Sequence, residues 1–218
     1  MNHIDELQEA VARFGMEIDA HNLASRGEPD EEVDETPVDP RSADHWTFGA
    51  PVAGGLVNSK AWMIVANTER IAYEDAIMVR RFKCAYIEYQ SLEDWRGARD
   101  IIRCNSCFHN EPRYDSLLVN QTEPGLHIAR ARALLRCRLP SGRNLDIALV
   151  RMFGQSRWKP KTRWDGCEVR LEEKEHSFLS MDYVIRGALM APVRSVKQPN
   201  TYYLVDTIDA DMFLRADQ

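Results

Sequence analysis

The sequence predicts one α+β domain: a small, strongly bent antiparallel sheet or open β-barrel with peripheral helices. Two observations predict it. Apolar residues alternate with polar ones over residues 129–139, which is typical of a half-buried strand. A turn at 140–143 then leads into a second β-rich segment, as in a hairpin. We expect the globular α+β domain at residues 60–218, an N-terminal amphipathic helix at 1–24, and an acidic disordered linker and loop at 25–59.

An apolar stripe marks the beginning of the chain. Ile4, Leu7, Val11, Phe14 and Ile18 follow one another at spacings of three and four residues. Such residues share one side of an amphipathic helix. Two heptads are too few for a coiled coil by themselves, so we expect the helix to dock on the body of the protein or on a protein partner.

The segment at 25–44 is rich in Asp and Glu and has almost no apolar side chains. It cannot bury enough surface to offset the entropy of ordering, so we expect it to be disordered. Residues 1–60 hold 13 acidic against 4 basic side chains, and residues 61–218 hold 21 against 24. An acidic arm therefore precedes a weakly basic body.

Composition narrows the class of protein. A hydrophobic content of 44% with 28% charged residues fits a globular domain. The longest wholly apolar run, residues 61–66, is too short to span a bilayer. The first residues are acidic where a secretion signal has bases, and 5 cysteines do not form a disulfide framework. We expect an intracellular protein, nuclear or cytoplasmic, without a cofactor or membrane contact.

A capping signal predicts a helix in the middle of the chain. Ser91 is followed three residues later by Asp94, as in a capping box, so a helix should begin there, with Trp95 facing the core. A further helix is expected at 60–80 and a loop at 105–112. The expected strands lie at 82–90, 114–120, 129–139, 144–153, 167–171 and 202–206.

The strand at 129–139 is expected to have one apolar and one basic side. Its arginines should lie on the outer side, and its small apolar residues should face the core. The apolar set is Ala129, Ala131, Ala133, Leu135, Cys137 and Leu139. We also expect a shared core of Trp95, Tyr114, Leu135, Ile147 and Phe213.

Seven segments keep a distinctive order over most of residues 78–215. They are Tyr89–Trp95, Asp100–Asn105, Phe108–His109, Pro112–Asp115, Ile147–Val150, Val184–Leu189 and Val205–Arg215. Together they resemble the C-terminal region of uncharacterised mushroom-fungal proteins associated with Plavaka or Kyakuja–Dileera–Zisupton type transposons. The resemblance implies a transposon-derived or transposon-associated module, and it attaches no activity to this region.

Cys104, Cys107 and His109 place three soft metal ligands within a short segment. A structural zinc site needs four ligands, and the other cysteines are isolated in the sequence. In the proteins that the chain resembles, a different residue often stands at the position of Cys107, which argues against a shared metal site. We expect buried cysteines and a structural histidine.

Aspartates provide the second candidate chemistry. Asp206, Asp209 and Asp211 lie near the C-terminus, and Asp115 and Asp146 lie near strand starts. If these carboxylates converged, they could hold magnesium for phosphoryl transfer. Otherwise they are turn and edge carboxylates that accept hydrogen bonds from amides or pair with arginine. No nucleophile motif, phosphate loop or dinucleotide fingerprint is present in the sequence.

The clearest functional pattern is basic and aromatic. If residues 157–164 are extended, four cations line one edge and two indole rings lie on the other, which suits phosphate contact and base stacking. These residues are Arg157, Trp158, Lys159, Lys161, Arg163 and Trp164. Arg130, Arg132, Arg136 and Arg138 should share one face of the alternating strand. The alternative is a solvated arginine face balanced by glutamates, because the body is only weakly basic.

We therefore predict a non-catalytic binding or interaction module of a transposon-derived protein. Its expected partners are DNA or RNA, through the Arg/Lys/Trp surface, or a protein, through the N-terminal helix. The acidic segment 25–44 should compete with nucleic acid for the arginines. The alternative is a metal-dependent nucleic-acid-processing enzyme, or a remnant of one, that uses the clustered aspartates.

Overall fold

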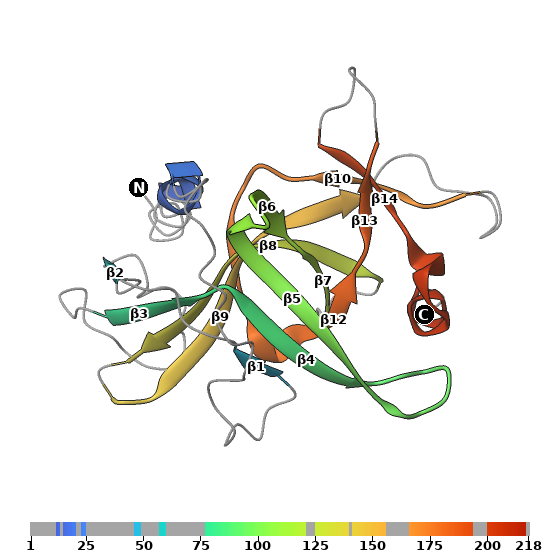
Figure 1. Cartoon of the computed structure of the whole chain (residues 1–218), viewed down its shortest axis with the longest axis horizontal. Coiled ribbons are helices and arrows are strands. Elements are labelled where there is room, and N and C mark those ends of the chain that lie inside the picture. The colour runs from blue at the N-terminus through green and yellow to red at the C-terminus, as the bar shows by residue number, and fades with distance from the viewer. Residues whose placement is uncertain are drawn as a thin grey trace.

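The computed structural model describes residues 12–13, 15–20, 23–24, 46–48, 57–59, 77–120, 125–139, 141–155, 166–193 and 200–216. Antiparallel strands dominate these ranges and form a nearly closed, barrel-like arrangement (Figure 1). The expected bent antiparallel sheet or open barrel is confirmed at this level, and the described helices are few and short. No helix in the described ranges is long and apolar enough to cross a bilayer. The acidic segment 25–44 lies outside them.

Two sheets build the body (Figure 1). In the smaller sheet the order is β1 (Trp46–Phe48), β4 (Cys84–Gln90), β5 (Gly97–Phe108) and β6 (Glu111–Tyr114). The larger sheet runs β12 (Val184–Ala188), β7 (Ser116–Val119), β8 (His127–Arg138), β9 (Asn144–Gln155), β10 (Val169–Glu172), β14 (Thr201–Leu204) and β13 (Met190–Pro192). Off this path, β11 (Ser177–Ser180) pairs with β9, and β3 (Ile77–Phe82) joins β2 (Val57–Ser59) to β8. The short helices are η2 (Met181–Tyr183), η3 (Asp206–Ile208) and α2 (Ala210–Arg215).

The predicted central hairpin is present as β8 and β9, but the faces of β8 differ from the expectation. The register shifts between Ala131 and Ala133, as at a β-bulge. Ala131 and Leu134 therefore join one apolar cluster, whereas Ala133 and Leu135 join another. The single apolar side expected for residues 129–139 is wrong, because β8 is covered by packed side chains on both faces.

Three apolar clusters form the core. The first lies between the two sheets and includes Phe48, Phe82, Ile87, Ile102, Leu117 and Val150. The second packs Ile18 of the N-terminal helix (helical residues 12–13, 15–20 and 23–24) against Val79, Leu135, Ile147 and Leu149. The third joins Met212 of α2 to Leu118, Ile128, Phe153 and Leu204. The described part of the N-terminal helix thus docks on the body, one of the two alternatives expected from the sequence.

The helix predicted to begin at Ser91 is wrong. The Ser91 Oγ accepts a hydrogen bond from Glu93 N at 3.2 Å, but the chain then turns back into β5. The β-branched Ile101 pairs across the sheet with Tyr86. Pairing with β4 therefore prevails over the local capping signal.

Three further expectations need correction. Residues 77–80 of the helix expected at 60–80 belong to β3, and the remainder of that helix lies outside the described ranges. The loop expected at 105–112 is a continuation of β5 to Phe108, followed by a tight turn and β6. Trp95 is 67% exposed, so its placement in the core is wrong. Leu135 and Ile147 are buried together, whereas Tyr114 packs on the first cluster and Phe213 is half-buried.

Candidate functional site

The hairpin of β4 and β5 presents the most distinctive surface feature of the described residues. Its strands pair from Cys84 and Arg103 at one end to Gln90 and Gly97 at the other. In Figure 1 the hairpin extends away from the body on the same side as the C-terminal helix. Trp95 lies in the connection between these strands and is 67% exposed. Exposure of an indole is unfavourable, because its large apolar surface then stays in water.

The backbone of the hairpin tip is fixed by hydrogen bonds. Trp95 N donates to Ser91 O at 3.0 Å, and Ser91 N donates to Arg96 O at 2.9 Å. The Gln90 side-chain amide donates to Trp95 O at 3.0 Å. Trp95 has a φ of 60°, in the left-handed region that large L-residues seldom adopt. The tip therefore holds an exposed indole in a strained but well-bonded conformation, which marks it as a candidate contact residue.

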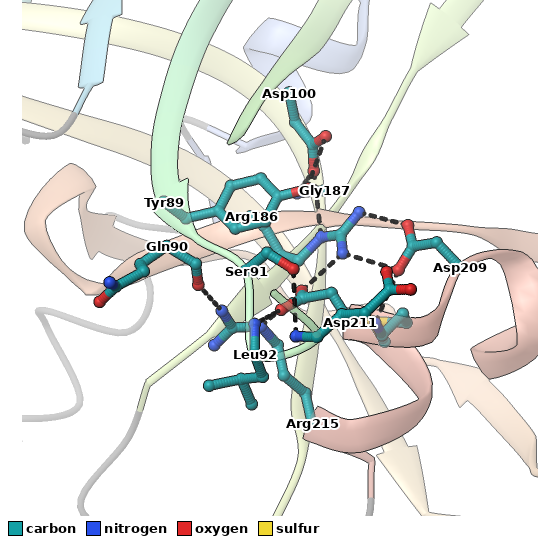
Figure 2. A network of polar contacts seen from close by, with 12 residues as sticks. Tyr89, Gln90, Ser91, Leu92, Asp100, Arg186, Gly187, Asp209, Asp211 and Arg215 are labelled. Carbon is teal, nitrogen blue, oxygen red and sulfur yellow. Dashed lines mark hydrogen bonds and ion pairs between the residues drawn. The ribbon is translucent and has the colours of Figure 1, made fainter. Parts of the chain in front are cut away.

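An ion network beneath the tip holds the hairpin in place (Figure 2). Its centre is Arg186 on β12, whose side chain is only 6% exposed. The guanidinium donates from Nη1 to Asp211 Oδ2 at 2.6 Å, from Nη2 to Asp209 Oδ2 at 2.8 Å, and from Nε to Asp100 Oδ2 at 3.1 Å. Charge-assisted hydrogen bonds of this kind are the strong ones. One arginine thus joins β5, β12 and the start of α2.

The same network links α2 directly to the hairpin tip. Asp211 Oδ1 accepts a hydrogen bond from Leu92 N at 2.6 Å. Arg215 donates from Nε to Asp211 Oδ2 at 2.7 Å and from Nη2 to Gln90 O at 2.8 Å. Asp209 caps α2, because its Oδ1 accepts from Met212 N at 2.7 Å. The position of the tip is therefore set by the C-terminal helix.

Tyr89 and Gly187 complete the network. The Tyr89 hydroxyl donates to Asp100 Oδ1 at 3.3 Å, and the Arg186 guanidinium lies 4.6 Å from the ring centroid. Burial, with the nearby charge of Asp100, raises the pKa of Tyr89 to about 12. Gly187 N donates to the same carboxylate at 2.9 Å. A Cβ at Gly187 would lie 3.2 Å from Ile102 Cδ1, so the close approach favours glycine.

Electrostatics reinforce this arrangement. Burial acts to raise the pKa of Asp209 and Asp211, but hydrogen bonds from Arg186 and Arg215 outweigh it and lower both. Burial acts in the opposite sense on Arg186, yet its bonds to the two aspartates raise its pKa above the ordinary value. All these groups therefore stay charged at neutral pH.

A shallow, open depression of about 640 Å³ lies against the same hairpin. Glu88, Tyr89 and Gln90 of β4 line one part of it, and Gly97, Ala98 and Arg99 of β5 line the other. The Arg99 guanidinium lies 5.2 Å from the centroid of the Tyr86 ring. The hairpin thus offers an aromatic side chain at its tip beside a mixed polar surface.

The arginines predicted to form a basic surface on β8 are largely engaged inside the protein. Arg136 binds Asp146 through two hydrogen bonds of 2.8 and 3.0 Å, and Arg130 pairs with Glu172 at 3.2 Å. Arg132 bonds to Asp19 of the N-terminal helix. Arg138 is exposed at the end of β8. The second predicted basic group, Arg157, Trp158, Lys159, Lys161, Arg163 and Trp164, lies outside the described residues.

The three predicted soft ligands lie in different environments: the two cysteines are buried, and the histidine is exposed. Cys104 and Cys107 are buried on β5 and are free thiols. Burial raises the pKa of Cys104 to about 12. His109 is exposed in the turn after β5 and meets the Phe108 ring edge-on at 4.3 Å. No group of three His, Cys, Asp or Glu side chains in the described ranges is arranged to hold a metal ion.

Four of the five aspartates considered for a magnesium site pair with arginines, at three separate places in the fold. Asp115 pairs with Arg113 at 3.0 Å, as in the alternative in which these carboxylates bind arginine. Asp146 pairs with Arg136, and Asp209 and Asp211 meet at Arg186, as described above. Asp206 begins η3. A guanidinium thus lies between the C-terminal carboxylates that do converge.

Sequence reasoning missed the network around Arg186. Its members come from four of the segments on which the expected family resemblance rests: Tyr89–Trp95, Asp100–Asn105, Val184–Leu189 and Val205–Arg215. The position of these residues within those segments was the one hint in the sequence that they belong together, because their spacing along the chain follows no recognisable pattern. No family model matches this chain, and no match is found among curated proteins or solved structures.

Proposed function

We propose that the chain is a non-catalytic binding module of a transposon-associated protein, and that the tip of the β4–β5 hairpin contacts nucleic acid. The carrying observation is Trp95, an indole left 67% exposed on a backbone that the hydrogen-bonded turn holds in place. Bases stack on such aromatic platforms regardless of sequence. The resemblance to transposon-associated proteins is the reason to test nucleic acid first.

Cationic side chains next to the indole support this choice. The Arg96 side chain is 86% exposed and lies 3.7 Å from Asp94, so the pair is weak and solvated. Arg99 lines the adjoining depression. Arginine contributes phosphate contact and cation–π stacking at single-stranded nucleic-acid sites. The tip thus combines, at one place, the two kinds of side chain that the sequence predicted for a binding surface.

The test is binding of a fluorescently labelled single-stranded oligothymidylate at about 50 mM salt, where phosphate-driven binding is strong. Trp95→Ala should weaken binding by about 1–3 kcal/mol, the usual value of one base stacked on an aromatic residue. Tyr183→Ala is the matched control, because Tyr183 is 54% exposed on η2 and lies outside the hairpin. Equal affinities of the wild type and Trp95→Ala would reject the hairpin as the contact.

A protein partner is the second candidate, favoured by the acidic residues at the same tip. Glu93 and Asp94 are exposed beside Trp95, and these charges repel phosphate. Trp and Arg are also the residues most enriched at the energetic centres of protein interfaces. A photoreactive amino acid at position 95 tests this candidate, with Ser141 in the exposed turn before β9 as the control position. Reproducible cross-linking to one protein from position 95 alone would support it.

A further inference from the structure

A second polar cluster lies where the N-terminal helix meets the body, and it goes beyond the proposed function. Asp19 Oδ1 accepts a hydrogen bond from Arg132 Nε at 3.0 Å. Asp19 Oδ2 accepts from Arg151 Nη2 and lies 3.3 Å from His176 Nε2. Two guanidinium groups and an imidazole therefore surround one carboxylate.

Three neighbouring strands build this cluster. Arg132 lies at the register shift of β8, and Arg151 lies on β9, opposite Arg130. His176 directly precedes β11, whose first residue, Ser177, pairs with Val150 of β9. The sheet thus brings the three side chains together without the helix. The helix supplies the carboxylate.

Asp19 does not satisfy all the hydrogen-bonding groups of its three partners. His176 Nε2 lies 3.2 Å from Arg151 Nε, which can only donate, and 3.3 Å from Asp19 Oδ2, which as a carboxylate oxygen can only accept. A single ring nitrogen cannot accept from one and donate to the other at the same time. Asp19 is thus one carboxylate shared by two guanidinium groups and an imidazole. A ligand with more oxygens and more negative charge would satisfy the cluster better.

We propose that Arg132, Arg151 and His176 form a binding site for a phosphate group, either inorganic phosphate or a terminal phosphate monoester, and that Asp19 occupies this site in cis. A terminal phosphate offers three acceptor oxygens and a charge of about −1.5 to −2 at neutral pH. Arginine forks suit this geometry. The site opens to solvent, because the side chains of Asp19 and Arg151 are each 25% exposed.

Occupation by phosphate and by Asp19 is mutually exclusive, so the site is coupled to the N-terminal helix. Ile18 and Gly15 also hold the helix on the body: Ile18 is 6% exposed in the second apolar cluster, and Gly15 packs so closely on the His176 ring that a Cβ would clash with it. Phosphate that displaces Asp19 removes this polar contact and leaves Ile18 and Gly15 in place. The coupling is reciprocal: the factor by which bound phosphate weakens docking of the helix equals the factor by which docking of the helix weakens phosphate binding. An event that releases the helix therefore strengthens phosphate binding.

The first experiment measures binding of inorganic phosphate to the full chain by ³¹P NMR line broadening and by thermal melting. Asp19→Ala leaves the carboxylate position empty. This variant should bind phosphate about tenfold or more tightly than the wild type does, because in the wild type the charge-assisted hydrogen bonds of Asp19 must first be broken. Asp19→Asn removes the charge with less change in shape and serves if Asp19→Ala does not fold. Binding should disappear in Asp19→Ala combined with Arg132→Gln.

The matched control is Asp146→Ala, which frees Arg136 from its two-bonded partner elsewhere on the sheet. Phosphate also stabilises proteins by exclusion from their surface, so the variants are compared at the same phosphate concentration, and sodium chloride at equal ionic strength controls for charge screening. A phosphate effect in Asp19→Ala no larger than that in Asp146→Ala would overturn the proposal. So would equal binding by the wild type and Asp19→Ala.

A second experiment separates the two sources of the phosphate and the two proposals. A 5′-phosphorylated oligothymidylate is compared with the same oligonucleotide without the terminal phosphate. Preference of Asp19→Ala for the phosphorylated form indicates a terminal monoester, whereas equal binding of the two with retained inorganic phosphate binding indicates the free ion. Trp95→Ala should leave inorganic phosphate binding unchanged. Loss of phosphate binding in Trp95→Ala would place the site at the hairpin and refute the assignment to Arg132, Arg151 and His176.

Discussion

Arg186 Nη1 lies 2.6 Å from Asp211 Oδ2, and the two side chains are only 6% and 5% exposed. This buried ion pair joins a strand of the larger sheet to the C-terminal helix. The other oxygen of Asp211 accepts from Leu92 N, so the pair also fixes the hairpin tip that carries Trp95. A buried charge pair of this type stabilises the fold only while all its partners remain in place.

Removal of Asp211 should therefore strongly destabilise the protein. In Asp211→Ala the buried guanidinium of Arg186 loses its closest partner, and Arg215 loses its own. We expect the free energy of unfolding to fall by about 3–5 kcal/mol, the usual effect of breaking a buried pair from one side. Urea unfolding followed by circular dichroism measures it. Asp182→Ala, at an exposed carboxylate that accepts from Ser180 Oγ, should change it by less than about 1 kcal/mol.

Stability should also fall in acid because of this network. The pKa values of Asp209 and Asp211 in the folded protein are lower than their ordinary value of 3.8. Groups with a lowered folded pKa add stability that is fully present above the unfolded pKa and is lost as the pH falls through the folded pKa. The unfolding free energy should thus decline from about pH 4 downward. Urea midpoints over a pH series measure this decline, which Asp211→Asn should reduce; an equally steep decline in that variant would contradict the assignment.

Local signals in the sequence predicted the central hairpin well and the β4–β5 hairpin poorly. The alternation over residues 129–139 predicted a strand followed by a hairpin partner, and β8 and β9 occupy these positions. A Ser at position 91 gives the same short side-chain bond to the backbone in a helix cap and in a turn. Whether a helix or a turn forms after Ser91 depends on the pairing of β5 with β4. The three residues after Ser91 do not encode that pairing. The bulge in β8 likewise depends on packing against both faces.

The candidate sites depend on contacts between distant residues. Leu92 N and Asp211 Oδ1 are separated by 119 positions, and Arg132 and Asp19 by 113. The sequence shows that acids and arginines are abundant, but not which of them meet. It therefore suggested a carboxylate cluster that could hold a metal ion, whereas in the structure Asp209 and Asp211 meet at Arg186, and Asp115 and Asp146 pair with other arginines. The prediction that the acidic arm covers arginines on β8 stays a prediction for residues 25–44, although Asp19 makes one such contact.

The thiol of Cys104 should be unreactive in the folded protein. Burial raises its pKa to about 12, and the thiolate is the reactive form. In native protein treated with iodoacetamide near neutral pH, the partly exposed Cys84 and Cys167 should react first, with Cys104 and Cys137 protected. Mass spectrometry of peptides locates the alkylated residues, and all the cysteines should react in denaturant. Rapid native alkylation of Cys104, or stoichiometric zinc that is lost in Cys104→Ser, would contradict this placement.

Trp95 should matter for binding and hardly at all for stability. Its side chain is 67% exposed and its φ is 60°, a conformation that glycine adopts without steric penalty. Trp95→Gly should therefore leave the free energy of unfolding unchanged or raise it by up to about 1 kcal/mol, because relief of the left-handed strain offsets the entropy of the glycine. Trp95→Ala keeps the strained backbone and should be close to neutral, whereas a Trp buried in the core would cost about 3–5 kcal/mol. Urea unfolding compares the three proteins, and oligothymidylate binding is measured on the same samples. Weakened binding in both variants with intact stability is the expected result; a loss of about 3 kcal/mol in either would show that the indole packs inside the fold.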